Sequence, residues 1–425
     1  MRAPGLRLKI AMSTEAVVAE TSFPKSQIRV LLLENVHASA HAMVRDEGFR
    51  LETLPGALGE DALVERIRDV HVLGIRSKTR VSERALGEAR RLLAVGAFCI
   101  GTNQVALDAA ARRGVPVFNA PFSNTRSVAE LVIAEVIALA RRLADRSREM
   151  HEGRWRKSAP SCYEVRGKTL GIVGYGHIGT QVGVLAEAVG MQVLFHDIAP
   201  KLPMGNNRPA ESLAALLAQA DFVTLHVPET PLTRGLVGDR ELARMKPGAY
   251  LLNLSRGSVV DVAALARSLA SGHLAGAAAD VFPAEPDGNA DDFATELRGI
   301  PNVILTPHVA GSTEEAQEAI GREVASALVK FVNTGATTGA VNFPHVELPP
   351  LRDRHRLLNV HRNVPGVLSD INRIVAEAHA NIESQLLATT PAVGYLVMDL
   401  NREVSEEVRQ RMSALPTSIR TRVLY

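Results

Sequence analysis

One six-residue loop constrains the fold of this 425-residue chain more than any other feature. It consists of Gly174, Tyr175, Gly176, His177, Ile178 and Gly179. The loop follows an apolar run, 170–173, and precedes a segment of helical character, 180–189. A dinucleotide pyrophosphate needs this order, because the glycines allow a tight turn, a bare backbone at the ligand and close helix packing. The pattern predicts a Rossmann unit, with a plain tight turn as the alternative.

Short apolar segments alternate with helical segments on both sides of this loop. The expected strands are 29–33, 72–75, 92–95 and 115–118 in a first unit, and 170–173, 192–195, 222–226, 250–253, 275–280 and 303–306 in a second. One long helix, 127–146, is expected between the units. This alternation predicts an α/β fold with two doubly wound parallel sheets. After residue 350 the order becomes strand, helix, strand, strand, helix, strand, which is typical of a ferredoxin-like sandwich.

Composition favours chemistry on a small molecule. The net charge is only +2 and 46% of the residues are hydrophobic, so we expect neither a nucleic-acid partner nor a membrane partner. No apolar run approaches the roughly 18 residues of a membrane span. Cys99 and Cys162 lack metal-ligand spacing and are too few for a disulfide framework, so no metal is expected and a cytoplasmic location is predicted.

Four polar residues predict the chemistry. Asp197 lies 18 positions after Gly179 at the end of the second strand, where a carboxylate takes the ribose hydroxyls of NAD and repels the 2′-phosphate of NADP. Arg256, Glu285 and His308 follow later strands, whose carboxyl ends meet at one crevice. His308 suits proton transfer, Glu285 would orient its imidazole, and Arg256 would hold a substrate carboxylate. Taken singly, His308 could be a structural histidine, Glu285 a loop carboxylate and Arg256 a member of a surface ion pair.

The order of these motifs resembles the D-2-hydroxyacid dehydrogenase family. The matching segments are 174–179, Asp197, 253–257, 280–286 and 306–311. Segments 98–105 and 119–127 resemble the D-3-phosphoglycerate dehydrogenase branch of that family, and the likeness runs from about residue 28 to residue 425. The resemblance implies NAD-dependent oxidation of 3-phospho-D-glycerate to 3-phosphohydroxypyruvate, the first committed step of L-serine biosynthesis. It also implies a homotetramer and raises reduction of 2-oxoglutarate to 2-hydroxyglutarate as a second activity.

The resemblance also implies further site residues. Additional cofactor contacts would come from His226, Val227, Pro228, Asn253, Ser255, Asp280 and Gly311, with Arg256 and His308 beside them. Substrate contacts would come from Arg76, Ser77, Lys78, Asn119 and Arg256, and from Trp155 and Lys157 of a neighbouring subunit. Ordinary packing is the alternative for Trp155. Pro55 stands where some relatives have a Lys, and Lys78 stands where an Arg is common; a Lys makes no bidentate phosphate contact.

The C-terminal segment resembles an ACT domain, a small regulatory module. Its ligand loop would hold L-serine through His361 and Asn363, with Asn381 contributed by the facing chain. The alternative is a polar loop that caps the following helix.

The expected organisation is an NAD-binding domain inserted in a flavodoxin-like substrate domain. The predicted segments are a disordered tail (1–25), the substrate-binding domain in two parts (26–123 and 309–343), the NAD-binding Rossmann domain (124–308), a linker (344–350) and the ACT domain (351–425). Two rival functions remain open at this point. One is a different D-2-hydroxyacid dehydrogenase, and the other is an NAD-sensing corepressor without enzymatic activity.

Overall fold

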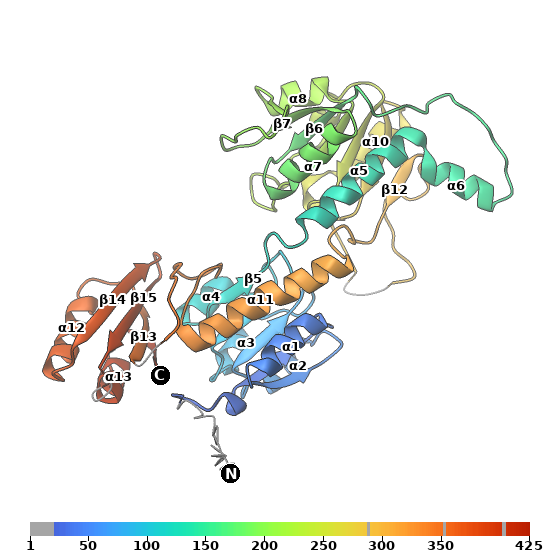
Figure 1. The fold of residues 1–425 in the computed structure, drawn as a ribbon. Coiled ribbons are helices and arrows are strands. Elements are labelled where there is room, and N and C mark those ends of the chain that lie inside the picture. Colours follow the sequence, from blue (N-terminus) through green and yellow to red (C-terminus); the bar gives the residue numbers. More distant parts are fainter. Residues whose placement is uncertain (1–20, 287–289, 352–353, 402–404) are drawn as a thin grey trace, which may run out of the picture.

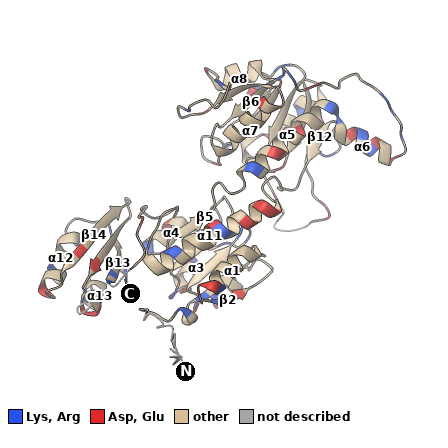
Figure 2. Ribbon diagram, in the orientation of Figure 1, with Lys and Arg blue, Asp and Glu red and all other residues tan. Residues whose placement is uncertain are grey.

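The computed structural model describes residues 21–286, 290–351, 354–401 and 405–425, and contains three sheets (Figure 1). Residues 1–20, most of the predicted tail, lie outside this range. Figure 2 shows acidic and basic residues interspersed on α5, α6 and α11. No helix in the described ranges is long and apolar enough to cross a membrane.

The first sheet is parallel, with the strand order β2-β1-β3-β4-β5. Its strands are β1 (Arg29–Leu32), β2 (Arg50–Thr53), β3 (Val72–Ile75), β4 (Ala94–Ala97) and β5 (Val117–Asn119). Its helices are α1 (Ala38–Asp46), α2 (Glu60–Ile67), α3 (Glu83–Glu88) and α4 (Leu107–Arg112), preceded by the turn η1 (Lys25–Gln27). This flavodoxin-like order reverses direction between β1 and β3, the switch point at which such sheets bind ligands.

The second sheet is also parallel, with the order β12-β11-β10-β9-β6-β7-β8. Its strands are β6 (Thr169–Val173), β7 (Gln192–His196), β8 (Arg208–Pro209), β9 (Phe222–Leu225), β10 (Ala249–Asn253), β11 (Leu274–Ala279) and β12 (Val303–Leu305). Its helices are α7 (His177–Ala188), α8 (Leu213–Gln219), α9 (Asp239–Leu242) and α10 (Val262–Ala270), with the turn η2 (Gly257–Val259). The order is that of a Rossmann sheet extended by one strand.

Two long helices connect the first two units. Helix α5 (Thr125–Arg141) leaves the first unit and runs along the second, while α11 (Glu314–Thr334) returns to pack on the first sheet (Figure 1). Where they start, the hydroxyls of Ser127 and Thr313 lie 2.8 Å apart. The single helix predicted over 127–146 is wrong, because Arg142 adopts a left-handed backbone (φ 52°) and a separate helix, α6 (Leu143–His151), begins there.

The third sheet is antiparallel, with the order β14-β15-β13-β16. Its elements are β13 (His355–Arg362), α12 (Val367–Glu377), β14 (Ile382–Thr389), β15 (Val393–Leu400), α13 (Ser405–Ser413) and β16 (Ser418–Leu424). This sheet docks on the end of α11, where the Tyr395 hydroxyl donates to the Gly335 carbonyl at 2.6 Å. Arg356, paired with Asp399 at 2.7 Å, donates to the Thr334 carbonyl. The predicted fold class is confirmed in all three units.

Candidate active site

The glycine loop has the geometry that a pyrophosphate requires. Gly174 has φ +91°, and a Cβ there would lie 2.3 Å from the His226 carbonyl oxygen. A Cβ on Gly179 would lie 2.2 Å from the Gly174 oxygen, whereas the space beside Gly176 is open. Helix α7 begins at His177 with no side chain capping its first N–H groups. An anion can therefore approach the backbone at a helix N-terminus, as a dinucleotide does.

Tyr175 and His177 have different surroundings within this loop. The Tyr175 ring is buried and stacks on Phe195 with ring centroids 3.8 Å apart, so its side chain belongs to the core. His177 stacks on Phe122 with ring centroids 3.7 Å apart, which links the glycine loop to the segment that enters α5. Of these two side chains, only that of His177 is exposed.

Asp197 lies beside the glycine loop at the end of β7. One carboxylate oxygen accepts the Tyr175 N–H at 2.8 Å, and the other accepts the Ala199 N–H at 2.9 Å. Each oxygen keeps further lone-pair capacity, so the carboxylate can also accept hydrogen bonds from a ribose. The residues present therefore fit the adenosine half of a dinucleotide.

The loops after β9 and β10 are fixed by internal contacts. The His226 ring lies 3.0 Å from the Thr224 hydroxyl, and burial lowers its pKa to about 3, so the ring is neutral at pH 7. Asn253 accepts the Ser255 hydroxyl at 2.9 Å and donates to the Arg256 carbonyl at 3.0 Å. Asn253 and Ser255 thereby set the backbone that presents the Arg256 side chain.

The remaining predicted cofactor contacts have local packing partners. Val227 lies against Gly174, the Pro228 carbonyl accepts the Thr233 hydroxyl, and Gly311 packs on Asn124.

His308 and Glu285 form a hydrogen-bonded pair. The Nδ1 atom of His308 lies 2.7 Å from a Glu285 oxygen, and the other Glu285 oxygen accepts the Phe282 N–H at 3.0 Å. The bond to Glu285 raises the pKa of His308, although desolvation opposes this shift. Burial pushes the pKa of Glu285 upward, but the His308 bond and the Phe282 N–H lower it on balance. The pair can hold a proton on Nδ1 and leave Nε2 for proton transfer.

Asp280 holds the loop that carries His308. Its fully buried carboxylate accepts hydrogen bonds from the Thr306 hydroxyl at 2.6 Å and from the Val309 and Ala310 N–H groups at 2.8 and 3.0 Å. The His308 N–H donates to the Asp280 carbonyl at 2.8 Å, and His308 has a left-handed backbone (φ 54°). The side chain of Asp280 is thus engaged in fixing the loop that carries His308.

Arg256 connects the second sheet to the first. A Cβ on Gly101 would lie 3.6 Å from an Arg256 nitrogen, so the guanidinium reaches the loop after β4. Its positive charge acts on both His308 and the Cys99 thiol and partly offsets the rise in the pKa of each, so the guanidinium lies near both groups. One guanidinium nitrogen donates to the Ser255 carbonyl at 2.6 Å, and among the described residues no carboxylate forms an ion pair with Arg256. The guanidinium is therefore available to an anionic ligand.

The predicted substrate contacts of the first unit lie in the loop that follows β3 and at the end of β5. Arg76, Ser77 and Lys78 follow β3, and Arg76 acts on the pKa of the same Cys99 thiol as Arg256 does. Burial raises the pKa of that thiol to about 11, so Cys99 is not a thiolate at pH 7. Asn119 ends β5 and donates to the Ile100 carbonyl at 2.5 Å.

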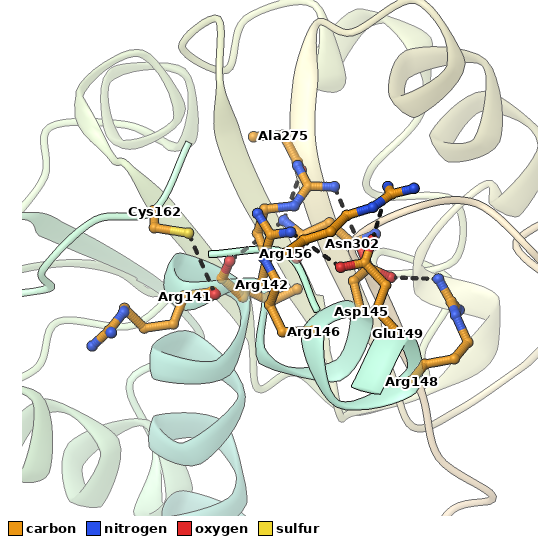
Figure 3. A network of polar contacts seen from close by, with 11 residues as sticks. Arg141, Arg142, Asp145, Arg146, Arg148, Glu149, Arg156, Cys162, Ala275 and Asn302 are labelled. Atoms are coloured by element: carbon orange, nitrogen blue, oxygen red, sulfur yellow. Dashed lines mark hydrogen bonds and ion pairs between the residues drawn. The ribbon is translucent and has the colours of Figure 1, made fainter. Parts of the chain in front are cut away.

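Trp155 and Lys157 lie apart from these residues, in the segment that follows α6. The Trp155 side chain is 79% exposed, which fits contact with another protein surface. Figure 3 shows the ion-pair network at the root of this segment, in which Asp145 accepts from Arg148 and from the Asn302 N–H, each at 2.8 Å. These contacts fix helix α6, while Trp155 and Lys157 lie exposed in the segment that follows it.

The three predicted serine-binding residues do not meet within one chain. The His361 ring is buried, lies 3.1 Å from the Asn359 oxygen and covers Gly394. Exposed Asn363 donates to the Thr390 carbonyl at 2.9 Å. Asn381 lies at the opposite end of the sheet, where its N–H donates to Asn401. These residues can share one ligand only across two chains.

Comparison with known proteins agrees with this geometry. Residues 133–310 match the model of the D-isomer specific 2-hydroxyacid dehydrogenase NAD binding domain, and residues 357–420 match an AHAS small subunit-like ACT domain. The D-3-phosphoglycerate dehydrogenase of Dictyostelium discoideum is 56% identical over 405 residues, covering 95% of this chain and 99% of the relative. That of Escherichia coli K12 is 52% identical over 411 residues, covering 96% and 100%.

The chain belongs to the D-3-phosphoglycerate dehydrogenase family. It is an NAD-dependent oxidoreductase. Among solved structures, NAD-dependent formate dehydrogenase from Staphylococcus aureus in complex with NAD is 28% identical, with a TM-score of 0.64 over 72% of this chain and 96% of that chain. D-lactate dehydrogenase from Aquifex aeolicus, complexed with NAD and lactic acid, is 27% identical, with a TM-score of 0.63 over 71% and 95%. Both neighbours were solved with NAD and support NAD as the cofactor.

Proposed function

We propose that the protein oxidises 3-phospho-D-glycerate to 3-phosphohydroxypyruvate with NAD as the hydride acceptor, in the pathway to L-serine. The pairing of His308 with Glu285, close enough to Arg256 for its charge to act on both, carries the proposal. The relatives over the full chain, named D-3-phosphoglycerate dehydrogenases, support this substrate.

His308 takes the hydroxyl proton in this proposal. Its neutral Nε2 accepts the proton while the C2 hydride moves to the nicotinamide, so the alcohol becomes a ketone. Glu285 stabilises the imidazolium that forms, and its bond to Nδ1 fixes the ring tautomer. Arg256 holds the substrate carboxylate in a planar two-pronged contact, which keeps C2 in place.

The phosphate end of the substrate would meet Arg76, Ser77 and Lys78 at the switch point of the first sheet. Asn119 contributes from the adjacent strand end, and Trp155 and Lys157 come from a neighbouring subunit of a homotetramer. Asp197 selects NAD over NADP, because its carboxylate repels a 2′-phosphate. The same cations would accept the distal carboxylate of 2-oxoglutarate, so we propose its reduction as a secondary activity.

We also propose that L-serine inhibits the enzyme from the third sheet. His361 and Asn363 of one chain and Asn381 of another would form the site, because these residues lie at opposite ends of the sheet. The ACT-domain match supports a ligand-binding role for this unit.

The test of the proposed reaction is NADH formation, followed by absorbance, with 3-phospho-D-glycerate, D-glycerate and D-lactate under identical conditions. The proposal predicts the highest kcat/KM for the phosphorylated acid. A higher value for either other acid would favour a different 2-hydroxyacid dehydrogenase. Complete absence of turnover, together with NAD-dependent binding of another protein, would favour a corepressor.

A further inference from the structure

Glu34 is a buried carboxylate at the switch point of the first sheet, outside the groups assigned above. It lies just after β1 and is almost completely buried, with only 7% of its surface exposed. Its backbone and that of Asn35 are left-handed, with φ 63° and 50°. Neither Glu nor Asn is glycine, so the chain accepts a conformational cost at this point. This turn brings the Glu34 side chain to the loop that follows β3, at the switch point where sheets of this order bind ligands.

The Glu34 carboxylate binds the backbone of the loop that follows β3. One oxygen accepts the Lys78 N–H at 3.0 Å, and the other accepts the Thr79 N–H at 2.8 Å. The Glu34 carbonyl oxygen receives a long contact, 3.5 Å, from the Arg76 guanidinium. Both oxygens of the carboxylate are therefore used on the loop backbone.

A second tether holds the same loop from another strand end. The Gln104 amide donates to the Arg76 carbonyl at 2.6 Å. Gln104 is itself buried and also contacts the Cys99 sulfur at 3.3 Å. The loop is thus fixed at Arg76, Lys78 and Thr79 by side chains from two different elements. Among the described residues neither Arg76 nor Lys78 forms an ion pair, and the Arg76 guanidinium contacts the Glu34 carbonyl rather than its carboxylate.

We infer that Glu34 is a positioning residue for recognition of the substrate's phosphate, acting through the Arg76–Thr79 loop, with Gln104 as its partner in this role. The inference rests on the proposed function, in which Arg76, Ser77 and Lys78 meet the phosphate. A buried carboxylate beside a phosphate site is unfavourable by charge alone. The two backbone N–H groups that it binds explain its presence, because these bonds fix the loop. The side chains of Arg76 and Lys78 can then bind the phosphate.

Glu34→Gln separates geometry from charge. Gln keeps the side-chain length but presents an NH₂ group to one of the two backbone N–H donors, so one tether is lost. Removing a negative charge should by itself tighten phosphate binding. A weaker affinity would therefore come from the lost loop geometry.

The experiment compares wild type, Glu34→Gln and the control Glu52→Gln, which removes an exposed carboxylate of the same sheet that pairs with Arg66. Steady-state constants are measured for 3-phospho-D-glycerate, D-glycerate and NAD. We expect Glu34→Gln to raise the KM for the phosphorylated acid about 10-fold or more, the effect of losing a hydrogen bond to a charged group. The KM for NAD and kcat/KM for D-glycerate should stay within about twofold of wild type, as should all constants of the control.

Three results overturn the inference or its basis in distinguishable ways. If wild type shows no preference for the phosphorylated acid, the proposed function itself fails. If wild type has the preference and Glu34→Gln retains it, the positioning role is refuted. If Glu34→Gln does not fold, Gln104→Met removes the second tether of the loop at similar volume, and an unchanged preference in that variant refutes the role.

Discussion

Glu135 provides a quantitative test of the structure through the pH dependence of stability. It lies on α5, its side chain is 3% exposed, and neither carboxylate oxygen has a hydrogen-bond partner among the described residues. Desolvation, with a smaller contribution from the Asp280 charge, raises the pKa of Glu135 from 4.5 to about 8. Glu135 is thus protonated in the folded protein at neutral pH.

The sign of the effect follows from proton linkage. Between pH 4.5 and about 8 the unfolded chain releases the Glu135 proton and the folded protein keeps it, so stability falls as pH rises. One pKa unit corresponds to about 1.4 kcal/mol, so the loss relative to pH 4.5 is roughly 3 kcal/mol at pH 7 and roughly 4 kcal/mol at pH 8, where the folded-state carboxyl is itself half ionised. Glu135→Gln keeps the shape and cannot ionise, so this loss should disappear.

The assay is urea unfolding of wild type and Glu135→Gln at pH 5, 6, 7 and 8. The free energy of unfolding of the variant, relative to that of wild type, should increase by several kcal/mol from pH 5 to pH 8, whatever the difference between the two proteins at pH 5. Glu130→Gln is the control, because Glu130 lies on the same helix but pairs with Arg126 in solvent, and such pairs contribute little. A stability difference between Glu135→Gln and wild type that does not change with pH would refute the reasoning.

Three further predictions concern the sites. Arg256→Lys should lower kcat/KM by about 2 kcal/mol, roughly 30-fold, because Lys makes no two-pronged contact with a carboxylate, and near wild-type initial rates would contradict the role. Glu285→Gln should shift the acid limb of the kcat/KM profile for alcohol oxidation to lower pH, because Glu285 raises the pKa of His308, and an unmoved limb would count against the pair. Asn363→Ala should raise the L-serine concentration for half-inhibition about 10-fold or more with kcat unchanged, whereas undiminished inhibition would place the effector elsewhere.

Truncation before the third sheet is a poorer test of serine inhibition than Asn363→Ala. Leu358, Val360 and Tyr395 of that sheet share one hydrophobic core with Phe331 of α11. Deleting the sheet would expose this apolar surface and disturb the whole first unit. Asn363 is exposed, so its replacement leaves the core intact.

The sequence predicts those elements whose burial is strong. Strands such as β6 and β9 are apolar and almost wholly buried, which gives the continuous runs that a parallel sheet requires. Strand β2 was missed because Arg50–Thr53 lies at a sheet edge and is largely exposed, so its residues carry no apolar pattern. Strand β8 has two exposed residues, one of them Pro209, and no sequence pattern marks it.

The candidate site was predictable where a residue type and its place after a strand coincide. This holds for His308, Glu285 and Arg256, which the structure brings together. Glu34 also lies just beyond a buried strand, two residues after the end of β1, so the same rule applied to the first sheet would have identified it. The role of Asp280 was not predictable, because its contacts with the His308 loop depend on a local backbone turn.

The measurement that tests the central claim most directly is the ratio of kcat/KM for 3-phospho-D-glycerate to that for D-glycerate, from NADH formation by the full-length protein. The site predicts a ratio well above 10, because the phosphate adds charged hydrogen bonds to Arg76 and Lys78. A ratio near one would contradict the assignment of the substrate.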